Sequence, residues 1–274
     1  MRRVVLEMKG ITKNFLSVRA LSKVDLNVYD GEVMALVGEN GAGKSTLMKI
    51  LSGIYKRDEG EIYFKGEKLV VNSPREAMNS GIAIIHQELN LIEGMSIEEN
   101  IFMGRFPMKG GRIDWKKMSR DAGALLERLN LKISPKILVK DITIGIKQMV
   151  EIAKALSLDA QIIIMDEPTD SLTDKETRSL FDVIGELKKQ GKSIVYISHR
   201  LREVFEICDD VTVLRDGNFI GENKVSEINE DMLIEMMVGR KLEEQYPYVE
   251  HKSEELIFEV KSMDNDLVGN IEFG

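Results

Sequence analysis

The feature that most constrains this 274-residue chain is the glycine-rich stretch GENGAGKST at residues 38–46. It matches the pattern G-x-x-x-x-G-K-[ST], with Gly38, Gly43, Lys44 and Ser45 at the four fixed positions. An apolar run that predicts a buried strand comes directly before it, and a run that predicts a helix follows it. A strand, a glycine-rich loop and a helix in this order are typical of a phosphate-binding loop.

The chemistry of this loop suits a nucleoside triphosphate with Mg²⁺. Glycines let backbone N–H groups turn toward phosphate oxygens, and the N-terminus of the following helix adds a partial positive charge. Lys44 is expected to reach the β- and γ-phosphates, and the hydroxyl of Ser45 to bind Mg²⁺. The residues expected to contact the nucleotide are Gly38, Asn40, Gly41, Ala42, Gly43, Lys44, Ser45 and Thr46.

Composition argues against several classes of protein. The net charge of −8 and the pI near 5.2 disfavour bulk electrostatic capture of nucleic acid, so no nucleic-acid partner is expected. Cys208 is the single cysteine, which rules out an internal disulfide and favours a reducing compartment. No apolar run approaches the roughly 18 residues that a membrane span needs, so any membrane role is expected to come through a partner.

Two carboxylates and a histidine follow predicted strands. Residues 161–165 predict a strand covered on both faces, because residues 162–165 are continuously apolar, and Asp166 and Glu167 come next. Carboxylates at the end of a buried strand are costly unless they are used. Beside a phosphate loop, Asp166 can hold Mg²⁺ and Glu167 can act on water. His199 ends a strand expected to run parallel to the first, which places it at the γ-phosphate.

Four further positions offer ligand chemistry. Gln87 follows a predicted strand directly, where polar ligand-facing residues gather in open α/β sheets. Phe15, between polar residues and a turn, either stacks on a planar base or is a partly buried loop aromatic. Thr143 and Gly145 open a predicted helix with a hydroxyl and free N–H groups, which suits either an anion or an ordinary N-cap.

The part of the chain from about residue 88 to residue 150 reads as a helical insertion in an otherwise αβ pattern. No strand signal appears across residues 89–131, and Ser96 with Glu99 predicts a capping box. Its apolar residues either form the insertion's own core or line a groove for a partner helix, and the two roles can coexist. They are Leu89, Leu91, Ile92, Met95, Ile101, Phe102 and Met103.

The C-terminal part of the chain changes character. Residues 241–255 are charged and without clear period, which predicts a linker. Residues 256–260, LIFEV, predict a strand that echoes residues 4–8, VVLEM. We therefore expect one domain over residues 1–240 and, at residues 256–274, the start of a second similar unit that is cut off.

Together these stretches resemble the nucleotide-binding subunit of ABC transporters over nearly all of residues 1–240. The resemblance implies an α/β P-loop NTPase with a RecA-like core, an antiparallel β subdomain and a helical insertion. The family's motifs fall on residues 38–46 (Walker A), Gln87 (Q-loop), residues 162–166 with Glu167 (Walker B and the catalytic glutamate), residues 171–174 (D-loop) and His199 (switch histidine).

By this resemblance the chain is an ATPase that uses ATP and Mg²⁺. The implied catalytic residues are Lys44, Gln87, Glu167 and His199, and the implied metal residues are Ser45, Gln87 and Asp166. Phe15 falls where the family stacks an aromatic ring on adenine, which favours the stacking interpretation.

Several stretches look closer still to the tandem ATPases of bacterial monosaccharide importers, the ribose, galactose and xylose group. They are residues 94–105, 148–155 and 196–200. This implies a peripheral subunit on the cytoplasmic face of the membrane, bound to a permease through the helical insertion. A second ABC domain and, indirectly, a periplasmic or extracellular sugar-binding protein are the other expected partners.

One motif departs from the family pattern. The signature L-S-G-G-Q is here ITIGI at residues 142–146, with Thr143 in place of serine and Gly145 kept. In the family, the signature of one domain closes over the nucleotide of the other. We therefore expect an asymmetric pair, in which the loop at residues 38–46 serves an active site and the site that Thr143 and Gly145 complete is weaker or silent.

Two other functions fit the family resemblance. A soluble ABC ATPase of translation or DNA maintenance would favour basic linkers, zinc-binding cysteines or a long coiled coil, which the charge, the single cysteine and the short insertion oppose. A domain kept only for regulation, without turnover, is opposed by intact Asp166, Glu167 and His199.

Overall fold

The computed structural model describes residues 2–85, 89–240, 260–265 and 268–273. The chain divides into two compact units, Met1–Gly239 and Arg240–Gly274. In the second, β13 (Val260–Asn265) pairs antiparallel with β14 (Val268–Phe273). The elements of the first are β1 (Val4–Phe15), β2 (Val18–Tyr29), β3 (Val33–Val37), α1 (Lys44–Leu51), β4 (Glu59–Phe64), β5 (Glu67–Lys68), α2 (Pro74–Asn79), β6 (Ile82–Ile85), α3 (Ile97–Ile101), β7 (Met108–Lys109), β8 (Arg112–Ile113), α4 (Trp115–Arg128), α5 (Ile144–Leu156), β9 (Ile162–Asp166), α6 (Asp174–Lys189), β10 (Ser193–Ile197), α7 (Leu201–Ile207), β11 (Asp210–Arg215), β12 (Asn218–Lys224) and α8 (Glu230–Val238).

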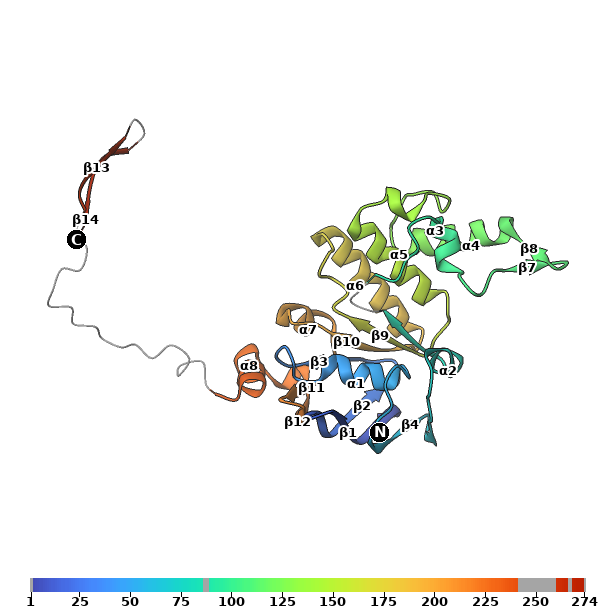
Figure 1. Cartoon of the computed structure of the whole chain (residues 1–274), viewed down its shortest axis with the longest axis horizontal. Helices are drawn as coiled ribbons and strands as arrows, with labels where there is room; N and C mark the ends of the chain where they lie inside the picture. The colour runs from blue at the N-terminus through green and yellow to red at the C-terminus, as the bar shows by residue number, and fades with distance from the viewer. Residues whose placement is uncertain (1, 86–88, 241–259, 266–267, 274) are drawn as a thin grey trace. The chain divides into compact units, whose positions relative to one another are not determined.

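Ten strands of the described residues form one sheet in the order β5-β4-β1-β2-β12-β11-β3-β10-β9-β6 (Figure 1). Its β11, β3, β10, β9 and β6 pair in parallel, whereas β1 pairs antiparallel with both β2 and β4. A parallel core beside an antiparallel portion is the α/β fold with a β subdomain that the sequence predicts.

Backbone pairing sets three functional strands at one level. Ile197 of β10 pairs with Leu36 of β3 on one side and with Asp166 of β9 on the other. Because parallel strands end at the same edge of a sheet, the segments that follow Val37, Asp166 and Ile197 begin side by side. The predicted parallel arrangement of the Asp166 and His199 strands is thereby confirmed.

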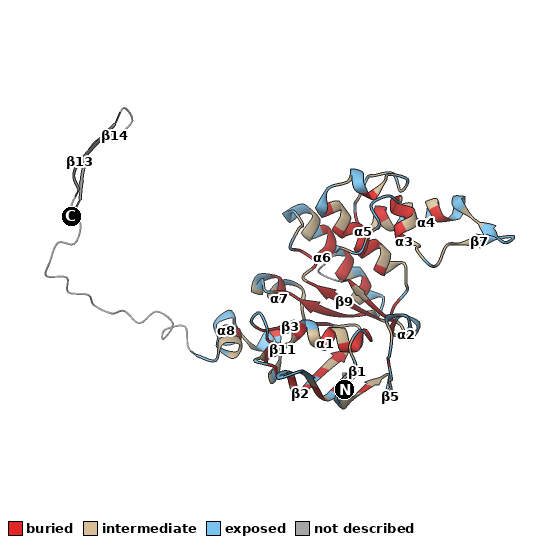
Figure 2. Ribbon diagram, in the orientation of Figure 1, coloured by how far each residue is buried: buried red, intermediate tan, exposed pale blue. Residues whose placement is uncertain are grey.

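Alternate side chains of the parallel strands bury themselves on opposite faces. In β9, Ile162 and Ile164 belong to the same buried cluster as Leu47 of α1, whereas Ile163 and Met165 join the cluster that contains α5 and α6. Strands β3, β9 and β10 are buried at every residue (Figure 2). This explains why their sequences are continuously apolar rather than alternating.

The helical insertion contains α3, α4 and α5. Ser96 and Glu99 form the predicted capping box at the start of α3. The expectation of no strand across residues 89–131 is wrong in one place, where β7 pairs antiparallel with β8. Strands of two residues are too short to show an alternation of apolar and polar residues, so no sequence periodicity indicates them. Within the described residues, no helix has the length and apolar character needed to cross a bilayer.

Candidate active site

The loop at residues 38–46 joins β3 to α1 and depends on glycine for both conformation and space. Gly38 and Gly43 have φ angles of 153° and 101°. A Cβ on Gly38 would lie 2.2 Å from the carbonyl oxygen of Leu214, and one on Gly43 would lie 2.6 Å from Cδ2 of Leu21. Side chains cannot be accommodated at either position without moving the backbone or the core.

Lys44 lies inside this loop, with only 7% of the residue exposed. Its Nζ donates hydrogen bonds to the carbonyl oxygens of Gly38 (2.8 Å) and Glu39 (3.1 Å). Burial lowers the pKa of the ammonium group, against the opposing charges of Glu167 and Asp166. The fold thus holds a cation among carbonyl oxygens, close to two carboxylates.

Asp166 ends β9 and is buried, with 8% exposed. Burial and then the charge of Glu167 raise its pKa to about 6, although Lys44 acts in the opposite direction. The site therefore contains more negative charge than Lys44 neutralises.

The chemistry of these residues fits Mg²⁺. The carboxylate of Asp166 and the exposed hydroxyl of Ser45 are hard oxygen donors of the kind that this ion prefers. A divalent cation would also neutralise the excess negative charge that raises the pKa of Asp166. Gln87, the third predicted metal residue, lies outside the described residues.

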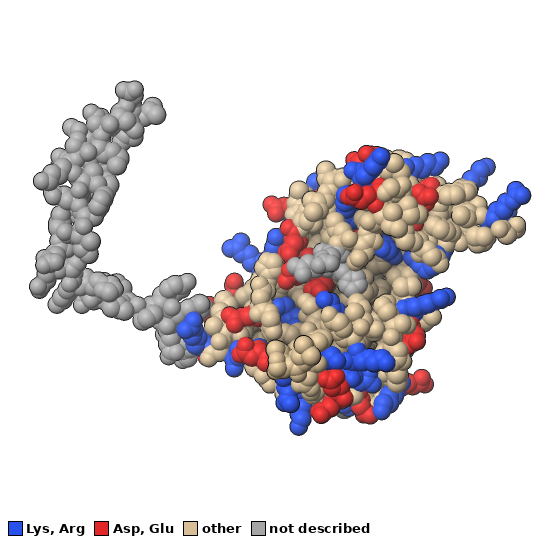
Figure 3. Space-filling view, in the orientation of Figure 1, with Lys and Arg blue, Asp and Glu red and all other residues tan. Residues whose placement is uncertain are grey.

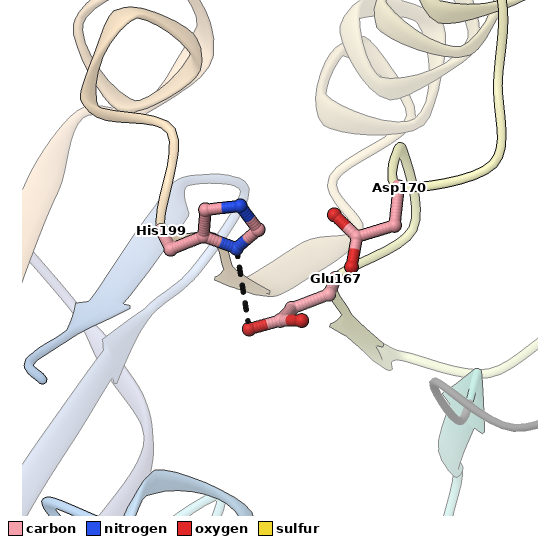
Figure 4. Close-up of side chains that lie close together, drawn as sticks. All are labelled: Glu167, Asp170 and His199. Carbon is pink, nitrogen blue, oxygen red and sulfur yellow. Dashed lines mark ion pairs between the residues drawn. The ribbon is translucent and has the colours of Figure 1, made fainter. Parts of the chain in front are cut away.

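Glu167 has an unusual backbone that directs its side chain. Its φ is 48°, in the left-handed region, which costs roughly 1–2 kcal/mol for a residue with a Cβ. Its N–H donates to the carbonyl oxygen of Ile197 at 3.0 Å, so β10 holds it there. The Nδ1 of His199 lies 3.5 Å from Oε1 of Glu167 (Figure 4). With Asp170, these residues place three ligand atoms within 4.8 Å of one another.

A cavity of about 590 Å³ brings most of the phosphate-loop residues together with Glu167 and His199, whereas Gly38 and Asp166 do not line it. It is lined by Ala20, Asn40, Gly41, Ala42, Gly43, Lys44, Ser45, Thr46, Glu167 and His199. The phosphate loop, the candidate base and the histidine come from three separate segments of sequence and meet here because β3, β9 and β10 end at one edge.

Three predicted residues lie elsewhere. Phe15 is the last residue of β1 and does not line this cavity; 38% of it is exposed, and its ring centroid lies 5.2 Å from that of Tyr55. Thr143 is the N-cap of α5 and accepts a hydrogen bond from the N–H of Ile146, at 3.5 Å. A Cβ on Gly145 would lie 3.0 Å from the carboxylate of Glu176, so glycine lets α5 approach the start of α6 closely.

Two residues at the site carry no sequence motif of their own. Ala20, on β2, comes from the antiparallel part of the sheet. Asp170 lies in the turn after β9, and its only signal is its position three residues after Glu167. Ala20 is brought to the site by long-range packing that sequence spacing does not encode, whereas Asp170 lies near Glu167 because the two are close in the chain.

Because the pKa of Asp166 is raised, replacing this residue by one that cannot ionise should stabilise the fold, by an amount that depends on pH. The folded protein holds this proton more tightly than the unfolded chain, so ionisation above about pH 6 destabilises the fold. Without Mg²⁺ and nucleotide, Asp166→Asn should raise the free energy of unfolding by about 1–3 kcal/mol at pH 8 and by much less at pH 4. Urea unfolding in EDTA measures this, with exposed Asp182→Asn as the control. Destabilisation by Asp166→Asn at pH 8 would contradict the assignment.

Comparison with known proteins gives a consistent result. A family model described as ABC transporter matches residues 21–170, more than half of the chain. A nucleotide-free ATP-binding cassette from an ABC transporter is 27% identical, with a TM-score of 0.73 over 87% of this chain and 96% of that chain. An ATP-binding cassette of an ABC transporter in its ADP conformation is 27% identical, with a TM-score of 0.75 over 87% and 100%. The cbiO1 protein from Clostridium perfringens, part of the ABC transporter complex cbiONQ, is 25% identical, with a TM-score of 0.71 over 88% and 97%.

The family match covers both β3 with its phosphate loop and β9 with its carboxylates, and the structural matches extend over the first unit as a whole. A further matching cassette is a dimer in a post-hydrolysis state with ADP and Pi bound, at 25% identity and a TM-score of 0.71 over 80% of this chain and 98% of that chain. The chain therefore belongs to the ABC transporter family, and it is an ATP-binding cassette that hydrolyses ATP.

Proposed function

We propose that this cassette powers the uptake of a monosaccharide through a membrane permease. The observation that carries the ATPase part is the one cavity that the phosphate loop shares with Glu167 and His199. The sugar importer assignment is supported by the resemblance of residues 94–105, 148–155 and 196–200 to the tandem monosaccharide ATPases. In this model the chain works at the cytoplasmic face of the membrane, and a periplasmic or extracellular binding protein delivers the sugar.

We also propose a tandem arrangement. Residues 1–240 form the first cassette, residues 241–255 a linker and residues 256–274 the beginning of a second cassette. The support is the echo of residues 4–8 in residues 256–260. The second cassette closes the nucleotide site with its own signature, as the family resemblance implies.

The phosphate loop binds the triphosphate. Backbone N–H groups of residues 38–46 surround the phosphate oxygens, and Lys44 stabilises charge on the γ-phosphoryl group. Lys44 is already buried in the loop, and its ammonium group would exchange its hydrogen bonds to the carbonyl oxygens of Gly38 and Glu39 for bonds to the phosphates when the nucleotide binds. Phe15, partly exposed at the end of β1, stacks on the adenine.

Ser45, Asp166 and Gln87 are the residues that would hold Mg²⁺. When bound, the ion neutralises phosphate charge as it develops. The positive charge of the ion would return the pKa of Asp166 toward its ordinary range and keep the carboxylate ionised, against the burial that raises this pKa.

Glu167 accepts a proton from the attacking water and orients it. Its left-handed backbone directs the carboxylate into the cavity, where 13% of the side chain is exposed. His199 is more exposed, at 53%, and also lines the cavity, so it can contact the γ-phosphate and help to arrange the water.

The helical insertion meets the permease. The segment after Gln87 is held on α5, because the N–H of Asn90 donates to Glu151 at 2.8 Å and Lys154 donates to the Asn90 carbonyl at 3.1 Å. Lys147 pairs with Glu93 at 2.7 Å. Gln87, as a proposed ligand of the metal site, can therefore couple a change at that site to movement of α5 and of the permease contact. On the face seen in Figure 3, charges of both signs are interspersed, which favours a protein partner over nucleic acid.

Removal of the proposed base should slow hydrolysis without preventing ATP binding. Glu167→Gln keeps the size of the side chain but loses its basicity, so we expect turnover to fall at least about a hundredfold. Steady-state ATPase assays and nucleotide titration measure the two effects. The control is Glu186→Gln, an exposed glutamate on α6. Near-normal turnover of Glu167→Gln would exclude this residue as the base.

The atypical signature should not limit the active site. In the two-cassette protein, replacing ITIGI at residues 142–146 by the family sequence LSGGQ should leave the ATPase rate unchanged, because these residues complete the other site. Lys44→Ala should still abolish turnover in that background. A large gain in rate after the replacement would show that the atypical signature limits turnover, and would contradict the expectation that the active site works independently of it.

The transporter assignment predicts co-purification with an integral membrane permease. Ile92, 47% exposed in the insertion, is a candidate contact, so Ile92→Asp should reduce the captured permease at least about tenfold. Val70→Asp is the control, because Val70 is exposed outside the insertion. Recovery of ribosomal or DNA-bound partners in place of a permease would support the soluble ATPase instead.

A further inference from the structure

Helix α7 carries a buried carboxylate that the roles above do not use. Glu203 is 7% exposed and accepts hydrogen bonds from three hydroxyl groups. Thr169 donates to its two oxygens at 2.8 and 3.0 Å. Tyr196 and Ser198 each donate to Oε2 at 2.8 Å. One anion therefore holds three side chains from two other segments of the chain.

Two of the three hydroxyl groups, those of Thr169 and Ser198, lie next to the proposed catalytic residues in sequence. Thr169 is two residues after Glu167 and directly before Asp170. Ser198 directly precedes His199. Its Oγ also accepts a hydrogen bond at 3.0 Å from the N–H of Arg200, the residue that directly follows His199. The carboxylate of Glu203 thus connects the turn after β9 to the end of β10.

The chemistry of this cluster depends on a negative acceptor. A buried carboxylate costs several kcal/mol unless donors satisfy it, and three hydroxyl groups supply that satisfaction. Arg200 lies 3.5 Å away and is itself 44% exposed, so it neutralises the charge only in part. Burial and the adjacent carboxylate of Glu203 raise the pKa of Tyr196, which keeps its hydroxyl a donor. A carboxamide at position 203 would offer one acceptor oxygen and an NH₂ group that cannot accept.

We propose that Glu203 is a positioning residue for ATP hydrolysis, which fixes the turn carrying Glu167 and Asp170 against the turn carrying His199. This inference rests on the roles proposed above for Glu167 and His199. Glu203 does not line the cavity and touches no substrate. It acts by anchoring both turns to one point, which, beside the main-chain hydrogen bond from Glu167 to Ile197, fixes the distance between the two catalytic groups.

The test is Glu203→Gln in the assembled ATPase, with Glu222→Gln as a matched control. Glu222, on β12, likewise accepts from a tyrosine hydroxyl (Tyr29, 2.5 Å) and from a polar side chain (Asn27, 3.0 Å), away from the cavity. We expect Glu203→Gln to lower kcat at least about tenfold and to leave KM for ATP within about twofold, since misplacement affects the reacting groups and not the phosphate loop. Glu222→Gln should lower the unfolding midpoint comparably and leave kcat unchanged.

Single-hydroxyl variants separate positioning from stability, and they remain informative if Glu203→Gln does not fold. Ser198→Ala and Thr169→Val loosen the turns directly, so each should lower kcat more than Tyr196→Phe does. Tyr196 is fully buried, and a purely structural cluster would make its variant the most damaging in both stability and rate. That reversed order, or a Glu203→Gln enzyme with normal kcat, would overturn the proposal.

These outcomes are distinct from failure of the catalytic assignment. If Glu167→Gln abolishes turnover while Glu203→Gln has normal kcat, only the positioning role is wrong. If Glu167→Gln turns over normally, the catalytic assignment on which this inference rests is wrong.

Discussion

The backbone pairing of β10 with both β3 and β9 is the constraint on which the active site depends. It aligns Leu36, Ile197 and Asp166 at one level of the sheet, so the chain leaves all three strands at the same edge. A shift of register by one residue would turn the side chains of a strand to the opposite face and move Glu167 away from the phosphate loop. The positions of the active-site residues are therefore determined first by backbone hydrogen bonds between strands and only then by side-chain contacts.

A second constraint is electrostatic. Asp166, Glu167 and Lys44 carry charge in a largely buried region, where burial raises the pKa of Asp166 and lowers that of Lys44. Each shift means that the charged form of the group is less favourable in the folded protein than in water. Ligands that bring positive charge to the carboxylates and negative charge to Lys44 remove this penalty. The arrangement links nucleotide binding to fold stability without any change of shape.

Much of the fold and the core of the site follow from sequence because their signals are local. Three apolar runs, each followed by glycine or polar residues, predict the strands and the residues at their ends, and a capping box marks Ser96. What sequence reasoning misses is non-local or very short. Glu203, on a seven-residue helix, accepts a hydrogen bond from Thr169, which lies 34 residues earlier in the chain, and no local sequence pattern indicates this contact. The β7–β8 pair has too few residues for a period.

The left-handed backbone at Glu167 has a consequence for how such a chain changes over generations. Glycine would occupy that conformation at no steric cost, and asparagine at a smaller one than glutamate. Either replacement would discard the carboxylate and leave a sturdier molecule. Selection for folding alone would thus favour loss of the glutamate, so its presence accords with the catalytic role that we propose for it. At this one residue, the stability of the fold and the proposed catalytic role favour different amino acids.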